Sequence, residues 1–247
     1  TNIKDLIQPK GGTSVAEVMQ NNINQVIEQR QKTGQPMFPH INHPNFGYAI
    51  SVEDMIQLEN ERFFEVYNGH PAVHNEGDSL RPDTESMWDL INIDFAKNGK
   101  PLMFGLATDD SHNYHSFGLE YSNTGRGWVM VRSQSLSPSD LIQAMEGGEF
   151  YSSTGVILAS YTADETKIRL SVEEEEGVEY RIHFIGYQQG NNGSAVLYET
   201  EGASATYVYQ PEDIFIRVKI TSDKIKHNPY QEGEYEVAWT QPILLNK

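Results

Sequence analysis

The chain has 247 residues, of which 38% are hydrophobic and 11% aromatic, so it can build a packed core and does not have the composition of a disordered protein. Its formal net charge of −17 argues against nucleic acid as a partner, because an acidic surface repels a phosphate backbone. No apolar run is long enough to predict a membrane span, and the absence of cysteine excludes disulfides and thiolate metal sites.

The first part of the chain predicts helices that alternate with strands. Residues 14–33 predict an amphipathic helix, because Ser14 and Glu17 form a capping-box pattern and apolar residues recur at helical spacing. Further helices are predicted at 51–60, 84–99 and 137–148, and short buried strands at 36–46, 62–70 and 101–110. This alternation favours an α/β domain with a mainly parallel sheet over residues 1–154.

The pattern changes after residue 154. Apolar residues now alternate with polar ones, first in 168–172, then in 180–184 and 214–220, and no helical pattern follows. Residues 155–247 therefore predict a small antiparallel β-sandwich domain.

Polar side chains gather after the three predicted strands of the α/β part. In α/β sheets, ligands bind outside the carboxyl ends of the strands, so these groups are candidates for one site. Imidazole and carboxylate ligands suit Zn, Fe, Mn or Ni, and the D-x-H spacing lets Asp110 and His112 point toward one ion. The three groups are His40, His43 and Asn45; Glu65, Asn68 and His70; and Asp109, Asp110, His112 and His115.

Each of these residues also has a purely structural interpretation. His40 suits support of a loop, and Glu65 and Asn68 suit stabilisation of a turn. His70 lies in a loop rich in Gly, Pro and Asn and is expected at the surface. Asp109 suits capping of a turn, with Asp110 left to bind metal. Spacing alone leaves the metal site and the structural roles as equal alternatives.

Several segments occur in the order found in a known superfamily. They are HINHPNF, EVYNGH, GLATDDSHNY, GRGWVMVRS and LIQAMEGGEFYSSTG, followed near the end by IFIRVKITSD and AWTQPI. Over nearly its whole length the chain resembles the PHP (polymerase and histidinol phosphatase) superfamily, and most of all its metal-dependent phosphoesterases. The resemblance implies a PHP-type distorted (β/α) barrel, with a polynuclear metal site at the strand carboxyl ends, followed by a β appendage.

The resemblance also implies residue roles and a reaction. His43, Asp110 and His112 match ligand positions, so they are predicted metal-binding and catalytic residues. The expected cofactors are two or three divalent ions of Zn, Mn or Fe, and a metal-activated water would attack phosphorus in a small phosphorylated substrate. Arg126 is a candidate for binding the phosphate, or else packs a loop. The other candidate substrate contacts are His115 and Asn45.

One feature of the superfamily is missing. PHP domains open with an H-x-H motif on their first strand, and this chain contains none. We therefore expect the first strands of the barrel to lie outside this sequence, with that N-terminal part as a possible partner. The chain begins at Thr1 rather than at a methionine, so a removed leader, and hence either a cytoplasmic or an exported location, stays open. The alternatives are a non-catalytic binding protein on a degenerate PHP scaffold, or a metal-dependent hydrolase of a non-phosphate bond.

Overall fold

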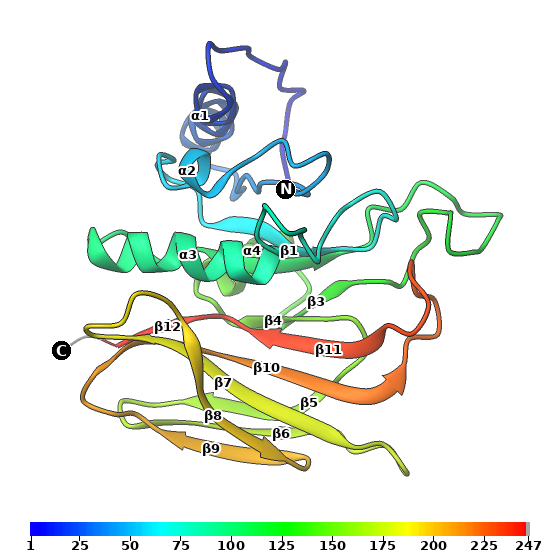
Figure 1. Ribbon diagram of the computed structural model, residues 1–247. Coiled ribbons are helices and arrows are strands. Elements are labelled where there is room, and N and C mark those ends of the chain that lie inside the picture. Colours follow the sequence, from blue (N-terminus) through cyan, green and yellow to red (C-terminus); the bar gives the residue numbers. More distant parts are fainter. Residues whose placement is uncertain (246–247) are drawn as a thin grey trace.

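The computed structural model describes residues 1–245, in which four helices and twelve strands form a mixed α/β fold (Figure 1). The helices are α1 (Val15–Thr33), α2 (Val52–Met55), α3 (Thr84–Lys97) and α4 (Pro138–Glu146). The strands are β1 (Phe63–Asn68), β2 (Phe104–Thr108), β3 (Trp128–Val131), β4 (Phe150–Ser153), β5 (Leu158–Ala163), β6 (Lys167–Val172), β7 (Tyr180–Gln188), β8 (Ala195–Glu201), β9 (Ser204–Val208), β10 (Asp213–Ile225), β11 (Tyr235–Thr240) and β12 (Ile243–Leu244).

The helices begin and end at the local signals that predicted them. The side chain of Ser14 accepts a hydrogen bond from the backbone N–H of Glu17 at the start of α1. Gly34 ends α1 at φ 69°, a left-handed conformation that glycine adopts without steric cost. Ser137 caps α4 in the same way as Ser14, and Pro138 occupies its first turn. The helices predicted at 14–33, 84–99 and 137–148 are confirmed, whereas the one predicted at 51–60 is limited to α2. The predicted capping box of Ser14 and Glu17 forms only in part, because the Glu17 carboxylate accepts from Thr13 instead of from Ser14.

Only one pair of strands is parallel within residues 1–245. β1 pairs with β2, and Ile41 adds a single parallel bridge to Phe64. The strand predicted at 36–46 is therefore wrong, because only two isolated bridges form there, the one at Ile41 and an antiparallel one from Phe46 to Val73. Pro39 and Pro44 flank the Ile41 bridge, and neither has a backbone N–H to extend the ladder.

The remaining strands form two antiparallel sheets, so the expectation of a mainly parallel sheet is wrong. A seven-stranded sheet has the order β3-β4-β11-β10-β7-β8, with β12 also paired to β10, and a three-stranded sheet has the order β5-β6-β9. No closed barrel forms in the part of the chain that the structure describes. The cause is the return of the chain after α4, which brings β4 antiparallel to β3 and then against β11. Strands from both sides of residue 154 thus share one sheet.

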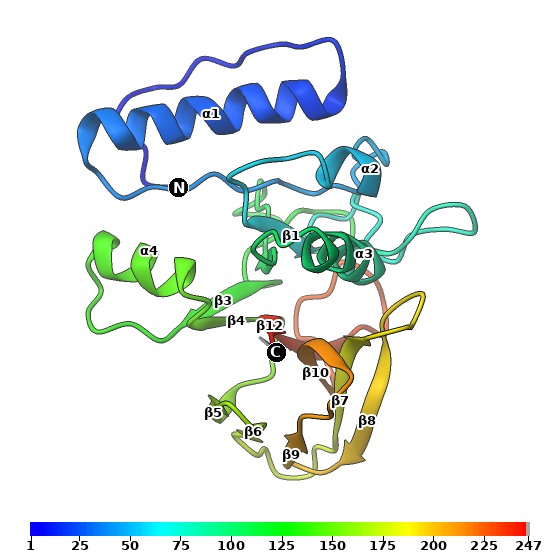
Figure 2. The same cartoon turned by 90° about the vertical axis from the view of Figure 1, so that its left-hand side faces the viewer.

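The seven-stranded sheet is covered on both faces (Figure 1, Figure 2). One face packs on α3 and the β1–β2 pair, through a core that includes Trp88, Phe215 and Trp239. The other face packs on the three-stranded sheet, and the predicted alternation is confirmed there. The second core contains Ile168, Leu170, Val172, Tyr180, Ile182, Phe184, Ile216, Val218 and Ile220. No helix among residues 1–245 combines the length and apolar character needed to cross a bilayer.

Glu61 is a buried acid at the entry to β1, and burial raises its pKa to about 8 from the ordinary 4.5. One carboxyl oxygen accepts from the N–H groups of Arg62 and Phe63, while the other has no hydrogen-bond partner among residues 1–245. In the unfolded chain this carboxyl ionises around pH 4.5, whereas in the folded protein it ionises only around pH 8. Its contribution to the free energy of unfolding is therefore fully present below pH 4.5 and is lost as pH rises through about 8. The protein should therefore lose stability between these two values.

Glu61→Gln should remove this pH dependence, because the amide does not ionise. Between pH 5 and 8 the free energy of unfolding of the unmodified chain should fall relative to Glu61→Gln by roughly 1–3 kcal/mol. Urea denaturation at a series of pH values measures the difference. Parallel pH profiles for the two proteins would contradict the assignment to Glu61.

Candidate functional site

Three adjacent chain segments leave the small parallel sheet at one edge. The segment around Ile41, β1 and β2 run parallel, so the residues that follow them meet at the same end (Figure 1). His43 follows the first segment, Glu65 and Asn68 lie in the second, and Asp110 follows the third. The structure therefore brings together members of all three polar groups that sequence spacing predicts, but not Asn45, Asp109 or His115.

Glu65 is the buried centre of this cluster, with a side chain only 5% exposed. Its Oε2 accepts hydrogen bonds from the backbone N–H of His43 and from Asn68 Nδ2, each at 2.7 Å. Its Oε1 lies 3.7 Å from Nε2 of His40. Burial would raise the pKa of Glu65, but the nearby His40 imidazole and the hydrogen bonds from Asn68 and His43 outweigh it and hold the pKa below its ordinary value. The cluster thus holds a carboxylate that stays ionised although it is buried.

Asn68 connects Glu65 to Asp110. Its Nδ2 also donates to Oδ2 of Asp110 at 3.2 Å, and its Oδ1 accepts from the backbone N–H of His70 at 2.8 Å. Asn68 is 1% exposed, so its amide is fixed in place by the fold. One rigid amide therefore sets the relative positions of two carboxylates.

The tautomers of two histidines follow from their backbone contacts. Nδ1 of His112 lies 2.7 Å from the Asp110 carbonyl oxygen, which only accepts, so Nδ1 carries a proton and Nε2 is left as a free donor of an electron pair. Nδ1 of His70 accepts from the N–H of Ala72 at 3.1 Å, so the proton of the neutral ring is on Nε2. His112 is thus prepared to bind a cation, and His70 to donate a hydrogen bond.

The imidazole rings are close to one another and to an exposed aromatic ring. The ring of His70 is 5.7 Å from that of His112 and 6.3 Å from that of Phe46, which is itself 5.3 Å from the ring of His43. Burial lowers the pKa of His70; the Asp110 carboxylate opposes this effect, while His112 and His43 add to it. The four rings form one wall beside the carboxylates.

Two of the predicted ligands have strained backbones. His43 has φ 26° and Asp110 has φ 48°, in the left-handed region that non-glycine residues rarely adopt. Such strain costs of order 1–3 kcal/mol and is concentrated at functional sites. Three other non-glycine residues, Asn2, Tyr48 and Asn60, also have positive φ, so this strain agrees with a functional role for His43 and Asp110 but is not confined to them.

Three predicted ligands lie in the cluster, but they do not form a compact triad. Nδ1 of His112 is 3.8 Å from Oδ1 of Asp110, and His43 contacts the pair only through Glu65, Asn68 and His70. Among residues 1–245, no three His, Asp or Glu side chains are placed to share one ion. The donor set itself, imidazole nitrogen and carboxylate oxygen, suits Zn, Mn or Fe.

None of the three candidate substrate contacts, Arg126, Asn45 and His115, forms a hydrogen bond or ion pair with the carboxylates or imidazoles of the cluster among residues 1–245. Arg126 is 1% exposed, and its guanidinium donates to the carbonyls of Gly69, Gly118, Tyr121 and Asn228 at 2.6–3.2 Å. This geometry corresponds to the alternative in which Arg126 packs a loop. Asn45 is buried and donates to the carbonyls of His74 and Pro82. His115 lies exposed in the loop after β2.

Asp109 has the structural role that the sequence offered as the alternative to metal binding, which is to cap a turn. Its carboxylate accepts from the backbone N–H groups of Gly125, Arg126 and Gly127 at 2.7–2.9 Å, which closes the loop between β2 and β3. The neighbouring Asp110 points instead to Asn68. The two adjacent acids therefore differ in role: Asp109 closes the loop, and Asp110 belongs to the cluster.

Asp109→Ala should loosen this loop, because three backbone donors lose their acceptor. We expect a loss of about 1–3 kcal/mol in the free energy of unfolding. Amide hydrogen exchange should quicken at residues 125–127, and it should not do so in Asp110→Asn. Unchanged exchange at these three amides in Asp109→Ala would rule out the loop-closing role.

Sequence reasoning underestimated Glu65, Asn68 and His70. It named all three as candidates but assigned none of them as a ligand, and it kept a turn role for the first two and a surface position for His70 as alternatives, whereas all three lie in the cluster. Their position at the end of a predicted strand was the available signal, but the contact from Asn68 to Asp110 spans 42 residues. Comparisons with protein-family models, curated proteins and solved structures find no match to this chain.

Proposed function

We propose that this protein is a metal-dependent hydrolase of phosphoesters. The observation that carries the proposal is the convergence of His43, Glu65, Asp110 and His112 at the carboxyl ends of adjacent parallel segments. The buried Glu65 carboxylate and the partly exposed Asp110 carboxylate, both held by Asn68 beside imidazoles, suit a cation site. In a structural core, ionised groups are costly unless they are paired with a positive charge. The strained backbones of His43 and Asp110 support the same assignment.

We infer that the α/β part corresponds to a portion of a PHP-type barrel. The segment around Ile41, β1 and β2 would then correspond to three of its parallel strands. The strands after residue 154 in the two facing antiparallel sheets would be the β-sandwich domain, and β3 and β4 of the α/β part would complete its larger sheet. This assignment rests on the sequence motifs and on the position of the cluster at the strand ends.

The residues of the cluster would have different roles in metal binding and proton transfer. Asp110, His112 through Nε2, and His43 would hold the ions, and Glu65 is a further carboxylate within the same network. A divalent cation bound there would supply positive charge for the phosphoryl oxygens and lower the pKa of water. His70 holds a proton on Nε2, from which it could donate to a phosphoryl or leaving oxygen.

A substrate panel tests the proposal. The metal-stripped protein should be assayed with p-nitrophenyl phosphate, bis-p-nitrophenyl phosphate and p-nitrophenyl acetate, before and after addition of Mn²⁺, Zn²⁺ or Fe²⁺. We expect hydrolysis of at least one phosphoester that depends on added metal and is lost with a chelator. Metal-dependent cleavage of the acetate ester alone would favour a non-phosphate hydrolase. Metal binding without any hydrolysis would favour a binding protein, and both results would reject the phosphoesterase.

A further inference from the structure

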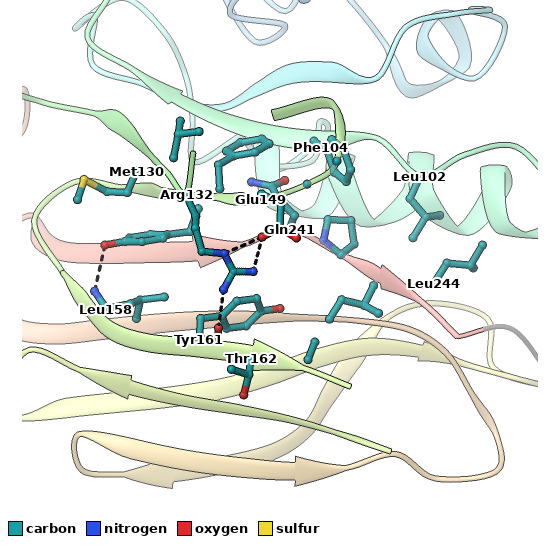
Figure 3. A pocket seen from close by; sticks show the side chains of 18 of the residues that line it. Leu102, Phe104, Met130, Arg132, Glu149, Leu158, Tyr161, Thr162, Gln241 and Leu244 are labelled. Atoms are coloured by element: carbon teal, nitrogen blue, oxygen red, sulfur yellow. Dashed lines mark hydrogen bonds and ion pairs between the residues drawn. The ribbon is translucent and has the colours of Figure 1, made fainter. Parts of the chain in front are cut away.

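A cavity lies at the other end of β1 and β2 from the candidate site. Its volume is about 790 Å³, within the range of roughly 300–1,000 Å³ typical of small-molecule sites. Arg62, just before β1, and Phe104, the first residue of β2, line it, whereas the candidate site follows the carboxyl ends of these strands. The cavity opens between the β3–β4 edge of the seven-stranded sheet, β5 and the chain around β12 (Figure 3).

Apolar side chains from separate elements line most of this cavity. They come from the segment before β2, from β2 itself, from β3, from β5 and from the C-terminal segment (Figure 3). Burying them under an apolar ligand would gain about 25 cal/mol per Å² removed from water. Met130 and Leu244, 37% and 40% exposed, and the half-buried Leu158 offer most of the area for this gain. Leu102, Phe104 and Pro242 are already buried and form the floor of the cavity.

Two arginines also line the cavity, and they differ in their partners. Arg132 forms an ion pair with Glu149 and also donates to the carbonyl of Tyr161 across the opening (Figure 3). Arg62 has no carboxylate within 4.0 Å among residues 1–245. Its guanidinium lies 4.3 Å from the centre of the Phe104 ring and reaches only the carbonyls of Leu102 and Glu146, at 3.3–3.4 Å.

Arg62 is unusual among the arginines of this acidic chain. Six of the eight arginines form ion pairs with carboxylates. The other exception, Arg126, is saturated by four carbonyl contacts of 2.6–3.2 Å. Arg62 makes only long contacts, so its positive charge is left for an anionic partner at an apolar wall.

We propose that this cavity binds a small amphipathic anion, with its apolar body against Leu102, Phe104 and Leu244 and its carboxylate on Arg62. A carboxylate matches the fork of the guanidinium, and the apolar wall strengthens the pairing by excluding water. The site is separate from the proposed hydrolytic site and does not depend on it.

Isothermal titration calorimetry with decanoate tests the proposal on the full chain, with decan-1-ol as the uncharged probe of the same length. Decanoate should bind at one site and more tightly than decan-1-ol. Arg62→Gln should weaken decanoate binding at least about tenfold, because it removes a charge-assisted hydrogen bond, and should leave decan-1-ol binding unchanged. Arg132→Gln combined with Glu149→Gln is the matched control, since it removes both charges of that ion pair and leaves the net charge of the cavity unchanged, and it should change decanoate affinity by less than about threefold.

Thr162→Trp adds bulk from exposed β5 into the cavity and should abolish binding of both probes without touching Arg62. Circular dichroism identifies a variant that fails to fold. If either Arg62→Gln or Thr162→Trp does so, the remaining one of these two variants decides the outcome. Absence of decanoate binding would overturn the proposal. So would equal binding of the two probes, or decanoate binding that survives either Arg62→Gln or Thr162→Trp.

Discussion

Arg217→Met should destabilise the protein by about 3–5 kcal/mol, because it leaves the buried carboxylate of Asp89 without its cation. The Arg217 side chain is 2% exposed, and Nε and Nη2 bind the two oxygens of Asp89 at 2.7 and 3.0 Å. Nη1 reaches Glu85 at 3.3 Å. Burial opposes the charged form, but Asp89 and Glu85 outweigh it and raise the pKa of Arg217. This ion pair connects α3, which carries Asp89, to the middle of β10, which carries Arg217.

Two further variants separate the ion pair from simple loss of packing. Arg217→Met combined with Asp89→Leu should recover much of the lost stability, because no buried charge is then left unpaired. Arg169→Met breaks the exposed pair with Asp164 and should cost less than about 1 kcal/mol. The free energy of unfolding in urea measures all three. A loss below about 1 kcal/mol in Arg217→Met would show that the buried pair contributes little.

Asp110→Asn should lower phosphoesterase activity and metal affinity by more than about 100-fold, since even residues behind a ligand contribute 10- to 100-fold. Asparagine tolerates φ 48° and keeps an oxygen that can accept from Asn68, so the fold should be preserved. Only the charge is lost.

Asp5→Asn is the matched control for this change, because Asp5 is an exposed aspartate whose contacts are made by its backbone. It should leave activity and metal affinity unchanged. Steady-state hydrolysis of the phosphoester found active in the panel measures the effect. Activity in Asp110→Asn within about threefold of the unmodified chain would remove Asp110 from the reaction.

Local features of the fold could be predicted from the sequence because they depend on neighbouring residues. The caps of α1 and α4 need only Ser14, Ser137 and the residues a turn away. Sheet pairing was not predictable in this way. β4 meets β11 through Ser152 and Trp239, which are far apart in the sequence, and no local pattern encodes that contact.

The alternation in β10 illustrates the same limit. Ile216, Val218 and Ile220 indicate one apolar face, and that face is in the second core. The pattern does not reveal that the opposite face is also buried, with Phe215 in the first core and Arg217 paired to a residue 128 positions away. A polar residue in an alternating strand can thus be buried when its partner lies on a distant helix.

In the candidate site, too, local relationships could be predicted from the sequence and contacts between distant segments could not. Asp110 and His112 were predictable as a pair because they share one turn, and Asp109 proved to be the structural member of that turn. The roles of Glu65, Asn68 and His70 depend on contacts between separate strands. For Arg126, four carbonyls from distant loops decide between binding and packing, and the sequence motif contains none of that information.

The most direct test of the central claim is the titration of metal-stripped protein with Mn²⁺ or Zn²⁺, followed by calorimetry and elemental analysis. The unmodified chain and His227→Ala, which changes an exposed histidine of the β10–β11 loop, should bind the ion with equal affinity. His43→Ala and His112→Ala should each bind it more than about tenfold more weakly. The same affinity in all four proteins would contradict a metal site at the carboxyl ends of β1 and β2.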